Sequence, residues 1–154
     1  MRRQPFNKNS MMRFWLRDER GTQLVELAIM LPLVAVLFGT VAEFGRMFYT
    51  YNTLAKATRA AARYAVVQPP EDASKDTAAK KLAVYGNTAG DGAPVVEGLD
   101  VANISVNRSG ELTTVTIQNF NYTPLFDLGK LIRNPDLSLN LPLAAKTTMR
   151  QIRK

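Results

Sequence analysis

One long apolar run near the N-terminus dominates the pattern of hydrophobic and polar positions. The run from Leu27 to Ala42 holds 16 residues without a charge and is interrupted only by one Pro, one Gly and one Thr. Starting it at Leu24 gives 19 residues, 24–42, and includes Glu26. Since about 20 helical residues cross the hydrocarbon core of a bilayer, the pattern predicts one membrane-spanning helix.

A helical period continues past the span as far as Val67. At 100° per residue, the apolar and small side chains share one stripe, and basic and polar side chains lie opposite. The stripe holds Phe44, Met47, Phe48, Tyr51, Leu54, Ala55, Thr58, Ala61, Ala62 and Ala65. Its alanine-rich end permits close approach of another element, which is either the chain's own head or a neighbouring subunit. Pro69 and Pro70 end the helix, which is predicted over 22–67.

A second, shorter helix is expected to follow. Glu71 and Asp72 are acidic residues in its first turn, and Gly86 after Tyr85 is a typical C-terminal stop. The next stretch, 87–98, is rich in Gly, Asn and Pro and indicates a loop.

The rest of the chain has the alternation of β-strands. Residues 101–122 predict a hairpin with its turn at 108–111. A long alternating run from Leu137 to Met149 predicts a further strand, in which Pro142 indicates an edge position or a bulge. The predicted fold class is α+β: a long N-terminal transmembrane and amphipathic helix, then a small head with a three-stranded antiparallel sheet and one or two short helices.

The charge of the chain is unevenly distributed. Its formal net charge is +7, of which residues 1–21 carry +4. A basic segment before a membrane span places the N-terminus in the cytoplasm and the C-terminal bulk outside. We therefore divide the chain into a basic cytoplasmic leader (1–21), a long helix (22–67, transmembrane over 24–42) and an extracytoplasmic α+β head (68–154).

Composition leaves little room for an enzyme. The chain has no Cys and no His, so thiol nucleophiles, His-based triads and zinc sites built on these ligands are excluded. An acid pair such as Asp127 and Asp136 has no pocket that the sequence can show, and Asp91, Glu97 and Asp100 lack the spacing of an EF-hand loop. We expect no catalytic residues, no metal site and no cofactor.

A basic C-terminus raises the possibility of nucleic-acid binding. Lys146, Arg150, Arg153 and Lys154 form this cluster, but no aromatic residues are interleaved with them. We interpret them as solvated surface charges and expect no nucleic-acid partner.

Three features of the first part of the helix point to function. Glu26 is a carboxylate within the predicted span, where it costs a few kcal/mol and is a functional hypothesis by default. If the chain were cut after Gly21, Thr22 would carry a new α-amino group one helical turn from Glu26. Pro32 removes one helical hydrogen bond within the span and predicts a kink or a loosened segment.

These residues resemble a known family. Gly21 and Glu26, with four residues between them, are similar to the processing site of type IV prepilin-like proteins. The stretch VELAIMLPLVAVLFGTVAEFGRMFY, followed by TRAAARYAVV, resembles the TadE-like proteins of the tight-adherence pilus system. The resemblance is strong over 21–67 and weak over Thr147 to Arg150. Where cleaved family members usually have Phe or Tyr after the Glu, this chain has Leu27.

The resemblance implies a minor pilin or pseudopilin that a prepilin peptidase cuts after Gly21, with a pilin-like head. Glu26 would then set the register of the subunit in assembly. The implied partners are the membrane, the prepilin peptidase, the major pilin and other pseudopilins, and the inner-membrane assembly platform; the implied place is the inner membrane, single-pass.

Two alternatives remain open. An ordinary secretory signal would be cut near Thr40 to Ala42, but the apolar run is longer than a typical signal core. The other alternative is an uncleaved, signal-anchored protein whose extracytoplasmic domain binds a ligand or a surface.

Overall fold

The computed structural model describes residues 19–69 and 73–151. Its longest element is α2, an α-helix over Glu19–Val67 that includes Pro32 and ends directly before Gln68. Among the described residues it is the one helix long and apolar enough to span a membrane, with a mean hydropathy of 2.4 over its most apolar window, none of which is buried. This is consistent with a single-pass membrane anchor. The chain separates into two units at Thr40–Val41, and the second unit contains the head.

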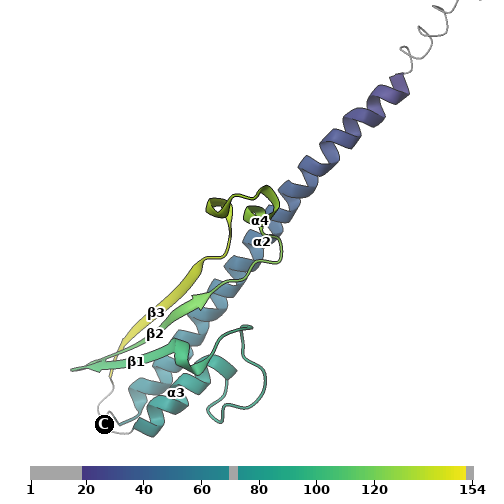
Figure 1. Cartoon of the computed structure of the whole chain (residues 1–154). Coiled ribbons are helices and arrows are strands. Elements are labelled where there is room, and N and C mark those ends of the chain that lie inside the picture. The colour runs from purple at the N-terminus through teal and green to yellow at the C-terminus, as the bar shows by residue number, and fades with distance from the viewer. Residues whose placement is uncertain (1–18, 70–72, 152–154) are drawn as a thin grey trace, which may run out of the picture. The chain divides into compact units, whose positions relative to one another are not determined.

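The head is built from one helix and a three-stranded sheet, with shorter pieces between them (Figure 1). Its elements are α3 (Ala73–Tyr85), β1 (Ile104–Ser109), β2 (Leu112–Asn121), α4 (Leu128–Ile132) and β3 (Pro142–Arg150). The strand order is β1-β2-β3 and both pairings are antiparallel. The predicted α+β class, with a long helix before a three-stranded antiparallel sheet, is confirmed.

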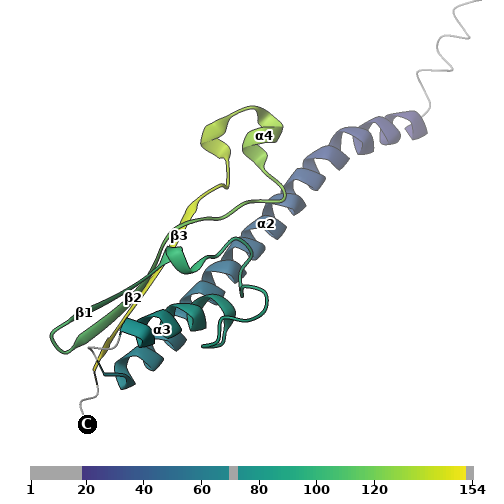
Figure 2. The same ribbon diagram turned by 60° about the horizontal axis from the view of Figure 1, so that its bottom comes forward.

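The core lies between the helices and one face of the sheet. Figures 1 and 2 both show α3 beside the C-terminal end of α2, with the sheet alongside. The main cluster of buried side chains comes from α2, α3, the 99–104 segment and all three strands: Leu54, Ala61, Ala62, Ala83, Val84, Leu99, Ile104, Val115, Ile117, Phe120 and Ala145. The alanine-rich end of the α2 stripe therefore packs on the chain's own head.

The aromatic end of the same stripe is not covered. Phe44 is 52% exposed and Phe48 is 66% exposed, whereas Leu54 and Ala61 are fully buried. Only the C-terminal half of the predicted stripe is thus used for packing within the chain.

Two strand boundaries differ from the sequence prediction. Residues Val101–Asn103 form a 3-10 turn, η1, because the Asp100 side chain accepts a hydrogen bond from the Ala102 N–H and caps it. Strand β3 begins at Pro142 and not at Leu137, because Pro135–Leu137 form a second 3-10 turn, η2, capped by Asn134. The alternation of apolar and polar residues predicted a strand through residues 137–141, but the capped turn at 134–137 delays the start of the strand to Pro142.

The edge position of β3 is confirmed, and Pro142 is its first residue. A bulge is also present, but it lies on the partner strand β2, where the register shifts between Ile117 and Phe120. Asn119 within it has φ of 57°, a left-handed conformation that Asn tolerates better than most residues.

Between β2 and β3 the chain makes an ordered excursion, residues 123–141. Its ends are joined by a hydrogen bond from the Tyr122 N–H to the Leu141 carbonyl, 2.9 Å. Inside it, Asp127 caps α4 by accepting from the Gly129 N–H and also accepts from the Ser138 hydroxyl. Gly129 is required there, since an added Cβ would lie 2.7 Å from the Ser138 nitrogen.

Some predictions fall outside the described residues. They are most of the leader, the acidic pair Glu71 and Asp72 expected to open the second helix, and the last two basic residues, Arg153 and Lys154. The predicted end of that helix is confirmed: α3 stops at Tyr85, and Gly86 follows with φ of 74°.

Packing of the alanine face can be tested by one substitution with a matched neighbour. We expect Ala61→Leu to destabilise the head by about 1–3 kcal/mol, because the site is fully buried and has no room for three more carbons. Ala60→Leu, on the exposed side of the same helix turn, is the control and should be nearly neutral. Pulse proteolysis of the full chain in detergent micelles measures both. Equal stabilities would contradict the packing of this face on the sheet.

Candidate functional site

The most elaborate polar cluster of the head surrounds Glu43, the residue directly after the apolar run. Its side chain is only 4% exposed. One carboxylate oxygen accepts hydrogen bonds from the Tyr122 hydroxyl and from the Leu125 N–H, the latter at 3.2 Å, and the other accepts from the Phe126 N–H at 3.2 Å. A charge buried this deeply costs several kcal/mol unless such donors surround it. Glu43 thereby fastens the start of the 123–141 excursion to α2.

Arg46, one turn further along α2, completes the cluster. Its Nε lies 3.9 Å from the nearer Glu43 oxygen, and its Nη2 donates to the Thr123 carbonyl at 3.3 Å. The guanidinium carbon also lies 5.6 Å from the centre of the Tyr122 ring, within the range of a cation–π contact. The buried negative charge is thus balanced by a half-exposed positive one.

The titration of the cluster follows from these contacts. Burial pushes the pKa of the Glu43 carboxyl upward, but the hydrogen bonds from Tyr122, Phe126 and Leu125 and the charge of Arg46 outweigh it, so the pKa lies below its ordinary value. Burial, and next the hydrogen bond to Glu43, raises the pKa of Tyr122. At neutral pH the pair is a carboxylate and a neutral phenol.

A groove of about 740 Å³ opens beside this cluster. Its walls come from Arg46, Tyr49 and Thr50 of α2, from the 95–98 loop and from residues 120–125. Arg46 and Tyr122 therefore belong both to the polar cluster and to the groove wall.

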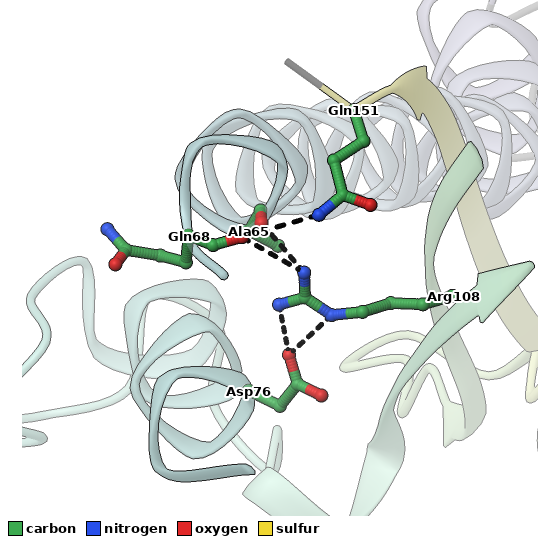
Figure 3. A network of polar contacts seen from close by, with 5 residues as sticks. All are labelled: Ala65, Gln68, Asp76, Arg108 and Gln151. Carbon is green, nitrogen blue, oxygen red and sulfur yellow. Dashed lines mark hydrogen bonds and ion pairs between the residues drawn. The ribbon is translucent and has the colours of Figure 1, made fainter. Parts of the chain in front are cut away.

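A second polar cluster lies at the other end of the head and is shown in Figure 3. The Arg108 guanidinium, from β1, makes two hydrogen bonds to one Asp76 oxygen, at 2.6 and 3.1 Å. It also donates to the carbonyls of Ala65 and Gln68 at 3.2 and 3.4 Å, and the Gln151 amide donates to the same Gln68 carbonyl at 3.5 Å. A cation at the free carbonyls of a helix C-terminus is favourable, so this cluster ties α2, α3 and β1 together.

The residues singled out from the sequence all lie on α2, away from both clusters in the chain. Gly21, Thr22 and Glu26 are exposed, and no hydrogen bond or ion pair involves Glu26 within residues 19–69 and 73–151. Pro32 lies inside the helix, which continues through it. Their proposed roles in cleavage, register and kinking stay predictions.

Sequence reasoning missed Glu43, although a signal was present. It is a single carboxylate directly after the apolar run and three residues before an arginine. The sequence at this position does not distinguish an exposed carboxylate from a buried one. Its partners are 79–83 positions away in the chain, and only the fold brings them together. Asp127, considered above as half of an acid pair, is used as the cap of α4.

Comparison with known proteins supports the resemblance at the start of the chain. Residues 21–63 match the family model described as TadE-like protein. The resemblance inferred from the sequence is therefore confirmed over this segment, which points to a protein associated with the tight-adherence pilus. No curated protein and no solved structure is significantly similar to the chain.

The role of Glu43 predicts a pH dependence with a definite sign. Because its pKa is lower in the folded than in the unfolded chain, its contribution is present above the unfolded value and is lost as the pH falls through the folded one. We expect the head to lose stability on acidification below about pH 4.5, measured by pulse proteolysis of the full chain in micelles.

Glu43→Gln separates this contribution from that of other carboxylates. At neutral pH it should destabilise the head by about 1–3 kcal/mol, because it turns an acceptor toward N–H donors into a donor. Its stability should also fall less steeply in acid than that of the unchanged chain. Glu97→Gln, at an exposed position, is the control and should leave the acid profile unchanged. Parallel profiles for all three proteins would contradict the role given to Glu43.

Proposed function

We propose that the chain is a pseudopilin required for assembly of a tight-adherence pilus and that a prepilin peptidase processes it after Gly21. The observation that carries this proposal is the match of residues 21–63 to the TadE-like family, with Gly21 at the start of the matched segment. The long apolar helix followed by a small α+β head agrees with it. The product acts as a structural protein and not as an enzyme.

Gly21 supports processing because nothing in the described fold requires a glycine at this position. A Cβ added at this position would meet nothing within 4 Å, and the residue lies inside a helix. Glycine in a helix interior costs about 1 kcal/mol relative to alanine. A requirement for glycine would therefore come from outside the fold, and a peptidase site that admits only bare backbone is such a requirement.

Glu26 supports assembly because it has no partner in the described part of the chain. Within hydrocarbon an unpaired carboxylate is costly. After cleavage the amino group of Thr22, on the same or a neighbouring subunit, is in reach of it. This pairing would set the register between subunits, as a single buried polar group does in a coiled coil.

Location and partners follow from the same proposal. The chain sits in the inner membrane with one span, its N-terminus in the cytoplasm and its head on the outer side, as the +4 charge of residues 1–21 favours. Its partners are the prepilin peptidase, the major pilin, other pseudopilins and the assembly platform.

A second candidate is an uncleaved anchored protein whose head binds a ligand. The observation in its favour is the groove beside Arg46 and Tyr122. The two candidates differ in the N-terminal residue of the mature chain, so the next experiment separates them.

Processing is tested by changing the residue before the cut. In a host that has the peptidase, the unchanged chain should begin at Thr22, whereas Gly21→Ala should stay 21 residues longer, because a methyl group enters a site shaped for glycine. Gly45→Ala is the matched control: it is also a helical glycine with nothing within 4 Å of an added Cβ, and it should be processed normally. Intact-mass measurement of the membrane fraction reads out all three. An unchanged chain that still begins with Met1 would favour the uncleaved candidate.

Assembly is tested at Glu26. We expect Glu26→Ala to leave membrane insertion intact and to abolish piliation, because breaking a buried ion pair costs about 3–5 kcal/mol. Gln23→Ala, one turn earlier on the exposed helix, is the control and should assemble normally. Surface pili are counted in a strain that has only the variant. Normal piliation with Glu26→Ala would reject the register role.

A further inference from the structure

The 123–141 excursion exposes an unusual amount of apolar surface for an ordered segment. Leu125 is 82% exposed, Leu131 58%, Ile132 57%, Leu137 48% and Leu141 42%. Within the segment, Asp127 accepts hydrogen bonds from the Gly129 N–H and the Ser138 hydroxyl, and Asn134 caps η2. The excursion is thus held in shape by polar contacts within it, while five of its large apolar side chains are exposed, which is unusual for a loop that faces only water.

The excursion is attached to the helix at the level where the span ends. The Leu125 and Phe126 N–H groups bind the carboxylate of Glu43, and Glu43 directly follows Ala42, the last residue of the apolar run. A helix rises only 5.4 Å per turn, so the start of the excursion lies within about one turn of the end of the run. Figure 2 shows α4 standing away from α2 at this end of the head.

The same level of α2 carries exposed aromatic side chains. Phe44, Phe48 and Tyr49 are 52%, 66% and 72% exposed, and they follow the apolar run within two turns. Aromatic residues gather at the boundary between hydrocarbon and headgroups. Helix and excursion thus present the side chains of a membrane interface at one end of the head.

The charges around the exposed leucines suit a headgroup layer. Lys130 and Arg133 flank Leu131 and Ile132, both are exposed, and neither makes an ion pair in the described part of the chain. Long basic side chains beside an apolar patch bury their stems in lipid and keep the charge at the headgroups.

We propose that the 123–141 excursion is a membrane-contacting foot, which inserts Leu125, Leu131 and Ile132 into the interface of the leaflet from which the head emerges. The occupant of this apolar surface is lipid, because the segment that carries it is hydrogen-bonded to Glu43, the residue directly after the apolar run. Together with α2 it gives the head two points of attachment and restrains its rotation about the helix. The inference rests on the membrane anchoring but not on processing or on pilus assembly.

The absence of cysteine from the chain allows a direct test with single labels. Leu131→Cys and Ile132→Cys carry an environment-sensitive fluorophore in the full-length protein, reconstituted into phosphatidylcholine vesicles at low protein-to-lipid ratio. Asn107→Cys, on the exposed face of β1 near the hairpin turn, is the control for a label in water. Leu33→Cys, within the span, is the control for a label in the hydrocarbon of the bilayer. Nitroxide groups attached to the lipid near the headgroup quench labels at the interface, and nitroxide groups near the end of the acyl chain quench labels at the centre of the span, such as the label at 33.

We expect the labels at 131 and 132 to emit at shorter wavelength than the label at 107 and to be quenched by the lipid nitroxides, while the label at 107 is not. Emission at 131 and 132 equal to that at 107 would overturn the proposal and leave the anchoring intact. If diluting the protein into more lipid shifted the emission at 131 and 132 to the wavelength of the label at 107, the result would overturn the proposal in favour of contact with a second copy of the chain. A label at 33 that is not quenched would overturn the anchoring and the foot together.

Discussion

The burial of Glu43 is the constraint on which the arrangement of the head depends. A carboxylate directly after an apolar run can be buried only if donors are brought to it, and the donors here come from a segment about 80 residues later. That requirement holds Tyr122, Leu125 and Phe126 against one turn of α2. It thereby decides where β2 ends, where the excursion starts and at which level of the helix both lie.

At the opposite end of the head, a cation holds the sheet against the helix. Arg108 meets the last carbonyls of α2 and the carboxylate of Asp76. Between the two clusters the contact of helix and sheet is mainly apolar, with one hydroxyl pair, Thr58 and Thr147, at 3.0 Å. An apolar interface alone resists separation but permits sliding, whereas charge-assisted hydrogen bonds at both ends fix the sheet lengthwise on the helix.

Much of this fold was predictable because periodicity reports local structure. The apolar run, the stop after Val67, the hairpin turn at 108–111 and the inward phase of Ala145 and Met149 are all visible in the chain. Periodicity failed at Leu137 and Leu139, whose alternation suits a strand, because a capped turn at Asn134–Pro135 bends the backbone first. It was also silent on Glu43 and Arg108, whose partners lie on other elements and become neighbours only once the sheet has formed.

Glu26 and Glu43, both on α2, represent opposite solutions to one electrostatic problem. Glu43 finds its donors within its own chain, and its position is thereby complete when the head folds. Glu26, 17 residues earlier on the same helix, has none in the described residues, and in hydrocarbon it is stable only if another group is supplied. A chain that satisfies one carboxylate internally and leaves the other unmet is prepared for a second event. In the function proposed above, the amino group that cleavage would release lies one turn from the unmet carboxylate, so processing and subunit association would be joined in one place.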